Sequence, residues 1–548
     1  MRDIIMNSKE SMSLHPRWSG ESTRTEILES SSEKNVGGEK GKPPAPAPVG
    51  FWDHRLKKTR VEVLKAWMKT SRCTDERMLF LLISPALILS VFILGVLSMY
   101  WAVLSHVNEN VSSLTIFVVD FDGMAPYTTV VPQIGPFIVQ ATEQRLAAPK
   151  PHLGYETVSR EHFANDPMNV RQEIFDQKAW AAIIINANAT ALLQRAVETG
   201  NTSYDPLGAC QIIWVEARDE DTIHAHVGPE LQSLAASLTA QFGARWTQQV
   251  LRNNSIPNNN LEAAPQALSP AIGFSIFNLR PFDPPVTVPA VTIGLIYLII
   301  ISFFSFAFYM PTHMKFLIPA GHPPLHFNQF IIYRWFATMA AYLSMSLFYS
   351  FISLAFQIPF NNPTAPGNEM AHNPNAYGAA TFVVYWMINW IGMIALGLAC
   401  ENVAMIIGQP WTAMWLIFWV ISNVATSFYA LDLTPKFYYW GYAWPLHQSK
   451  LPHLAVLGQG IDIFPVVEAS RSTLFDLHSR IGLNFGVLFA WAAVNSLFFP
   501  FCCYFMRWKT QRQKRKEMEA QKRKEDEQKG GLPQELPRSR GVASRKVS

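Results

Sequence analysis

The sequence predicts an α-helical polytopic membrane protein of six transmembrane helices, with an extracytoplasmic α/β domain between helices 1 and 2. Three observations support this fold class. The 548-residue chain is 49% hydrophobic and only 16% charged, and several windows of more than 20 residues contain no charged side chain. Basic residues gather just before the first apolar segment and just after the last. The N-x-Ser/Thr sequons lie between the first two apolar segments.

Residues 1–77 are predicted to form a disordered cytosolic tail that ends in a juxtamembrane basic segment. The first 50 or so residues are rich in Ser, Glu, Lys, Gly and Pro, without apolar periodicity or the hydrophobic core of a signal peptide. The first transmembrane helix is predicted at 78–103, with basic residues on its N-terminal side. Because cytosolic flanks carry an excess of Lys and Arg, the N-terminus is expected in the cytosol.

Residues 104–285 are predicted to form the extracytoplasmic α/β domain. Apolar, β-rich runs at 114–122, 180–188 and 211–218 alternate with helical patterns at 130–147, 167–178, 189–199 and 222–252. In the last pattern, apolar residues recur at three- and four-residue steps, which predicts a helix face packed on the sheet: Leu231, Leu234, Leu238 and Phe242. With Cys210 as the domain's single cysteine, its stability must come from a packed core.

Residues 286–505 are predicted to form a five-helix transmembrane domain, with helices at 287–309, 330–356, 379–400, 411–431 and 481–505. Each is long enough to cross roughly 30 Å of hydrocarbon. Six helices return the chain to the cytosol, where residues 506–548 form a basic and mixed-charge tail that lies on anionic lipid or is simply solvated. Glycosylation is expected at four sequons on the opposite side: Asn110, Asn188, Asn201 and Asn253.

Few strongly polar residues fall in the predicted membrane helices, and four are candidate transport or structural residues: Arg334, Asn389, Glu401 and Asn423. Asparagines can simply join neighbouring helices by hydrogen bonds, and Arg334 can extend towards the lipid headgroups. Glu401 follows the small-residue run "GMIALGLACE". At the predicted helix end, its carboxylate either faces the cytosol or responds to protons or cations.

The segment "IFVVDFDG" carries two aspartates after the first transmembrane helix. Asp120 and Asp122 are two residues apart, so on a strand both would point to one face, where a divalent cation could bind in a lumenal transferase. The favoured interpretation is that the strand ends here and that Asp122-Gly123 opens a turn. No GxSxG, HExxH, paired CxxC or P-loop motif is present, so no enzymatic activity, cofactor or metal is expected.

Several segments resemble the fungal nitrosoguanidine-resistance membrane proteins, a family defined by a domain of unknown function (DUF3533). The family is distantly similar to the membrane subunits of ABC-2 type exporters and to phage-infection proteins. The resemblance covers about residues 80 to 505, and the segments that carry it are "IFVVDFDG", "IFNLRPFDPPVTVPAVTIGLIYLIIISFF", "IIYRWFATMAAYLSMSLFYSFISLAFQ", "YWMINWIGMIALGLACENV" and "FYYWGYAWPLHQ".

The resemblance implies one membrane helix, a large external domain and then five more helices. It also implies a role in resistance to toxic compounds or in plasma-membrane lipid distribution, with no catalytic residue to transfer. The family pattern that this sequence resembles includes Arg334 and Glu401. It also includes Asp120, Asp122 and Arg280, which are candidate structural residues.

The expected function is therefore export of, or tolerance to, toxic small molecules at the plasma membrane, with both termini in the cytosol. The expected partners are membrane lipids, a small-molecule substrate and a second copy in a homodimer, and no nucleic acid. The alternative is a non-transporting structural or regulatory membrane protein whose external domain binds a partner.

Overall fold

The structure is a computed structural model of the chain. It describes residues 76–316, 325–362, 370–374, 376–408, 410–446, 466–478 and 481–530. Residues 1–75 of the predicted N-terminal tail and 531–548 of the predicted C-terminal tail lie outside the described residues. All contacts discussed below lie within the unit that residues 82–548 form.

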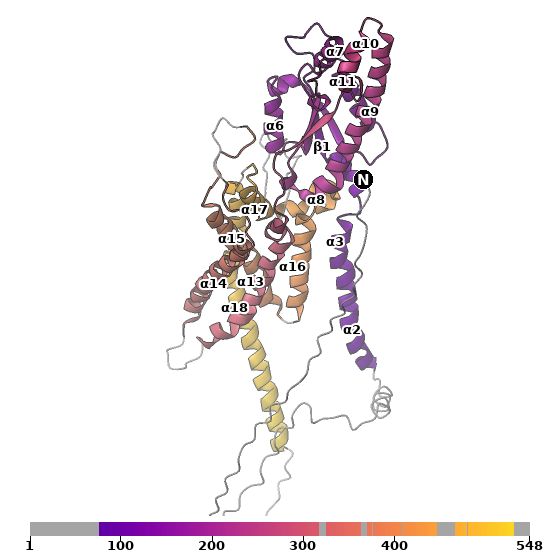
Figure 1. The fold of residues 1–548 in the computed structure, drawn as a ribbon. Helices are drawn as coiled ribbons and strands as arrows, with labels where there is room; N and C mark the ends of the chain where they lie inside the picture. Colours follow the sequence, from indigo (N-terminus) through magenta and orange to yellow (C-terminus); the bar gives the residue numbers. More distant parts are fainter. Residues whose placement is uncertain are drawn as a thin grey trace, which may run out of the picture. The chain divides into compact units, whose positions relative to one another are not determined.

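A five-stranded sheet forms the centre of the α/β domain (Figure 1). Its strand order is β2-β1-β3-β4-β5, with β2, β1 and β3 parallel, β4 antiparallel to β3, and β5 parallel to β4. The strands are β1 (Thr115–Asp120), β2 (Gly154–Val158), β3 (Ala181–Ile185), β4 (Cys210–Trp214) and β5 (Phe274–Asn278). The predicted strands at 114–122, 180–188 and 211–218 are confirmed, whereas the two edge strands β2 and β5 are not anticipated by the sequence analysis.

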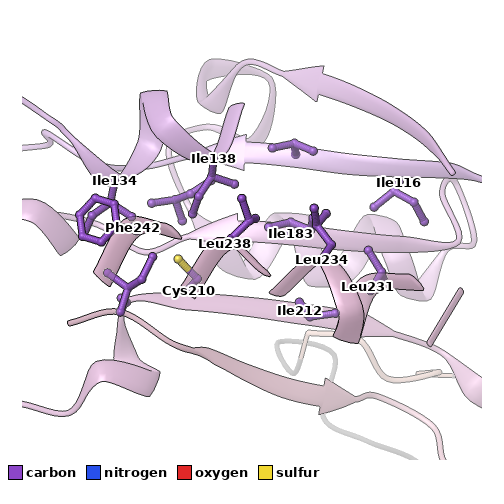
Figure 2. Packing of buried hydrophobic residues seen from close by; sticks show 14 of the residues in the cluster. Ile116, Ile134, Ile138, Ile183, Cys210, Ile212, Leu231, Leu234, Leu238 and Phe242 are labelled. Carbon is purple, nitrogen blue, oxygen red and sulfur yellow. The ribbon is translucent and has the colours of Figure 1, made fainter. Parts of the chain in front are cut away.

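Helices cover both faces of this sheet, as the labels α6 and α9 show in Figure 1. They are α5 (Ile134–Leu146), α6 (Pro167–Phe175), α7 (Ala189–Thr199) and α9 (Gly228–Arg252). The apolar face predicted for α9 is confirmed, because its leucines pack with Ile116, Ile183 and Ile212 of the sheet (Figure 2). Local sequence explains the helix ends: Asp166 accepts a hydrogen bond from Met168 N–H at the start of α6, and Gly200 ends α7 at φ 65°.

Five helices in the described part of the chain are long and apolar enough to cross a membrane. One runs over Ser84–Ser113 and includes the end of α2 (Glu76–Phe92) and α3 (Ser98–Ala102). The others are α13 (Ile296–Lys315), α14 (Phe327–Ala355), α15 (Thr381–Ile407) and the membrane part of α18 (Ile481–Gly530). The helix predicted at 411–431 is present as α16 (Trp411–Ser427), but its 17 residues extend only about 25 Å. The six-helix count therefore stays a prediction.

The predicted helix at 287–309 differs from the structure at its start. A short helix α12 (Val288–Val291) and a break near Gly294 precede α13. Tyr349 of α14 places its hydroxyl 3.3 Å from the Pro289 carbonyl and 3.1 Å from the Gly294 carbonyl. The tyrosine hydroxyl thus supplies a donor to backbone carbonyls at the break, where the regular helix is interrupted.

Helix α15 is the central helix of the transmembrane domain. In its most apolar window 78% of the residues are buried, against 33% or fewer in the other four candidate helices. Small residues allow this packing: a Cβ added to Gly397 would lie 2.6 Å from both Ser302 Cβ and the Tyr342 hydroxyl. The predicted end of this helix at residue 400 is wrong, because α15 continues to Ile407 and encloses Glu401.

Candidate functional site

A buried ion pair lies inside the helix bundle, near the start of α14 and the end of α15. Arg334 of α14 donates from Nη2 to Glu401 Oε1 of α15, and the two side chains are 1% and 2% exposed. Both residues are candidates in the sequence, where they fall near the ends of two separate predicted helices. The structure brings them together, and mutual neutralisation explains why a carboxylate is tolerated inside α15.

Soft and aromatic groups complete the environment of the Arg334 guanidinium. Its Nη1 lies 3.1 Å from Met405 Sδ and 3.6 Å from Cys503 Sγ. Its Cζ lies 5.4 Å from the ring centre of Phe306 and 5.1 Å from that of Phe499. These contacts stabilise a cation without adding a second carboxylate, so Glu401 is the single described anion that pairs with Arg334.

Glu401 also lines a small cavity of about 10 Å³ between α13, α14 and α15. Its Oε2 atom and Nδ1 of His313, which lines the same cavity, have no hydrogen-bond partner among the described residues. Ser305 and Thr338 each add a hydroxyl group to the lining of this cavity. A cavity of this size has room for about one water molecule, and these polar atoms would provide its partners.

Two further asparagines of α15 join it to its neighbours. Asn389 donates to Ser350 Oγ of α14 at 3.0 Å, and Asn402 donates to the Asn495 carbonyl of α18 at 2.9 Å. Asn423 instead donates to the Trp419 carbonyl within α16 at 2.8 Å. Of the four predicted membrane residues, Arg334 and Glu401 therefore form one site, Asn389 lies elsewhere on the same helix, and Asn423 contacts its own helix.

The two aspartates of "IFVVDFDG" make contacts within the α/β domain. Asp122 is buried, and its Oδ1 accepts from Thr190 N–H at 3.1 Å and Gly123 N–H at 3.0 Å, while its Oδ2 accepts from the Thr190 hydroxyl. Asp120 accepts from Asp122 N–H at 2.8 Å. Asp122 thus fixes the first turn of α7 and the turn at Gly123. Among the described residues, no group of three His, Cys, Asp or Glu side chains is placed to hold a metal ion.

Ion pairs connect the α/β domain to the segment before α18. Arg280 contacts Asp476, with Nη2 to Oδ2 at 2.8 Å, and donates to the Ala371 carbonyl at 2.8 Å. Arg471 of helix α17 (Val466–Leu474) lies 2.6 Å from Glu220 Oε2 and donates to the Ala217 and Arg218 carbonyls. Sequence reasoning identified Arg280 but missed Arg471, because the polar segment that contains it shows no pattern that points to a partner in a distant domain.

The Asp219 carboxyl lies beside this contact and is expected to make stability depend on pH. Burial raises its pKa from 3.8 to about 6, although nearby Arg471 acts to lower it. A pKa that is higher in the folded state means stabilisation that is present at low pH and lost as pH rises through about 6. Relative to Asp219→Asn, the free energy of unfolding of the wild type should fall by at most about 3 kcal/mol between pH 4 and 7. Thermal unfolding of both proteins across this range checks it, and parallel pH profiles would contradict it.

The predicted glycosylation residues differ in exposure. Asn201 and Asn253 are exposed, whereas Asn110 is half-buried and donates to the Leu433 carbonyl at 3.1 Å. Asn188 is buried at the start of α7 with φ 62°, and its Nδ2 lies 3.4 Å from the Ala125 carbonyl.

Comparison with known proteins places this arrangement in a family. Residues 85–497 match the family described as "Protein of unknown function (DUF3533)", a region that includes the sheet, α17 and the Arg334–Glu401 pair. The chain belongs to the DUF3533 family. With its apolar helices, it is a membrane protein.

This DUF3533 protein has a relative in Saccharomyces cerevisiae, the "Uncharacterized endoplasmic reticulum membrane protein YJR015W". The two are 27% identical over 355 residues, which is 62% of each chain. The similarity thus spans less than two thirds of the relative's length. No solved structure shows a significant match to this chain.

Proposed function

We propose that the protein contributes to resistance to toxic small molecules of the nitrosoguanidine type, by exporting them or by altering the distribution of lipids in its membrane. In this proposal it is not an enzyme, and it acts on drug or lipid as a membrane protein of the nitrosoguanidine-resistance type that its sequence resembles. The observation that carries the proposal is the buried Arg334–Glu401 pair in the membrane helices.

A fully buried ion pair is poorly explained by stability alone. Removing both charges from water costs several kcal/mol each, and apolar replacements of buried pairs are often equally or more stable. Ionisable residues inside membrane helices commonly mark transport pathways or proton relays. The unpaired Glu401 Oε2 and His313 Nδ1 beside a water-sized cavity support a proton gradient as the energy source.

The proposed location is a membrane of the secretory pathway, with the α/β domain on the extracytoplasmic side and both termini in the cytosol. The yeast relative is named for the endoplasmic reticulum, whereas the nitrosoguanidine-resistance resemblance implies the plasma membrane. Both locations give the sequons the same side of the membrane, because the secretory pathway preserves topology.

Glycan mapping in a eukaryotic host is expected to find sugar on Asn201 and Asn253 and none on Asn188. The first two side chains are exposed, whereas Asn188 is buried and the Thr190 hydroxyl of its sequon hydrogen-bonds to Asp122. Glycopeptide mass spectrometry checks this pattern. Residues 312–328 are expected in the cytosol. A glycan on a sequon engineered within this segment would place it outside the cytosol and would contradict the proposed orientation.

Reconstitution of the purified protein into liposomes tests the proposed function. The protein should move a labelled phospholipid or a labelled nitrosoguanidine-type compound across the bilayer, and export should respond to an imposed proton gradient. Empty liposomes and liposomes with an unrelated membrane protein provide the background rate. A purified, folded protein that moves neither probe, with or without the gradient, would exclude transport.

A hollow on the α/β domain favours the second candidate, a non-transporting protein whose external domain binds a partner. The hollow has a volume of about 660 Å³ beside α7, and its lining includes the polar side chains of Arg195, Asn201, Ser203, Tyr204 and Asp205. A partner that requires these residues, together with inactive liposomes, would support this candidate over transport.

A further inference from the structure

A second pocket lies where α13, α14 and α18 meet at the basic end of α18. Its volume is about 300 Å³. Apolar side chains from the end of α13 and the start of α14 form one wall, and polar or cationic side chains of α18 form the other. The lining residues are Met314, Leu325, Phe327, Phe330, Met506, Arg507, Thr510, Gln511 and Lys514.

The α18 side of the pocket follows the helical repeat. Arg507, Thr510 or Gln511, and Lys514 are separated by three, four and seven residues, so they share one face of the helix. Arg512 and Lys516 lie on other faces of the same basic segment of α18. The pocket therefore receives two particular cations rather than the whole basic cluster.

The two cations of the pocket have no anionic partner among the residues that the structure describes. Neither Arg507 nor Lys514 forms an ion pair with a described carboxylate, and no acidic side chain is among the described lining residues. Arg507 is held in place by Phe327, with its Cζ 4.3 Å from the ring centre. The pocket thus combines unneutralised positive charge with an apolar wall.

The position of the pocket matches the boundary of a membrane. Exposed apolar residues such as Phe501 and Phe505 precede it on α18, and charged residues follow from Arg507 onward. A ligand bound here would have its anionic part level with Arg507 and Lys514 and its apolar part beside Met314 and Phe330.

We propose that this pocket binds the phosphate headgroup of an anionic membrane phospholipid, with its acyl chains against the apolar wall. A free phosphate ester would satisfy the cations but leave the apolar wall exposed, so the lipid is the ligand that fits both halves. The proposal does not depend on transport, because it concerns only the binding of one lipid at the basic end of α18.

Native mass spectrometry of the full-length protein in detergent tests the site, with phosphatidylserine titrated against phosphatidylcholine. The wild type should retain one phosphatidylserine molecule. Arg507→Gln/Lys514→Gln should weaken its binding by about 30-fold, which corresponds to about 2 kcal/mol. The matched control, Arg512→Gln/Lys516→Gln, removes the same charge from other faces of α18 and should weaken binding by less than about threefold.

Three results would overturn the proposal. An equal loss of binding in both double variants would mean diffuse attraction to a basic helix. Equal retention of phosphatidylcholine would mean an apolar groove without headgroup selection. Displacement of phosphatidylserine by an equal concentration of glycerol 3-phosphate would identify a soluble phosphate ester as the ligand. The exposed positions of the four substituted side chains keep all variants foldable.

Discussion

Glu401→Leu is expected to destabilise the protein by about 3–5 kcal/mol. The substitution leaves the Arg334 guanidinium 1% exposed, with two sulfur atoms and two aromatic rings as its remaining neighbours. An uncompensated cation in this position cannot reach water without opening the contact of α14 with α15. Thermal unfolding of the purified protein in detergent measures the effect, with the loss of monodisperse protein as the readout.

The double variant Arg334→Met/Glu401→Leu is the control for this substitution. It removes both charges and keeps an apolar volume between the helices, so its stability should return to within about 1 kcal/mol of the wild type or exceed it. A Glu401→Leu protein as stable as the wild type would contradict the buried pair.

Arg471→Met is expected to cost about 3 kcal/mol and to loosen the contact between α17 and the α/β domain. Arg471 is 2% exposed, and its loss leaves the Glu220 carboxylate without its cation and the Ala217 and Arg218 carbonyls without donors. Thermal unfolding measures the stability, and hydrogen exchange should increase in residues 216–222.

Arg252→Met provides a matched control, because Arg252 lies exposed at the end of α9. Its effect should stay within about 0.5 kcal/mol. If Arg471→Met unfolds and exchanges like Arg252→Met, then Arg471 does not hold α17 to the α/β domain.

Local patterns predicted the elements that carry strong apolar signals. The run from Ile116 to Val119 marks β1, and the spacing of Leu231, Leu234 and Leu238 marks α9. The edge strand β2, "GYETV", contains no apolar run, and Tyr155 is its one buried residue. Strand β5 is only five residues long and lies directly before the membrane entry, where the apolar residues Ile276 and Phe277 are exposed rather than part of a buried run.

Local sequence patterns do not show which residues from distant parts of the chain form an ion pair. A hydropathy window ends a membrane helix at a charged residue, which is why the predicted helix stopped before Glu401. Its partner Arg334 is on another helix, and only the packing of α14 on α15 places the two groups together. The same reason applies to Arg471 and Glu220, which no sequence spacing connects.

The length of α16 bears on the membrane topology. Its 17 residues extend about 25 Å, a few ångströms less than the hydrocarbon thickness of roughly 30 Å. An odd number of crossings would put the two termini on opposite sides, whereas the basic clusters at both ends favour one side.

The most direct test of the proposed function compares the wild type with Arg334→Met/Glu401→Leu in the same liposome assay. The double variant is expected to fold, so its activity reports on the charges rather than on stability. Transport by the wild type and a loss of at least about tenfold in the folded double variant would agree with a functional role of the ion pair. Equal transport rates of labelled lipid and drug in the two proteins would contradict it.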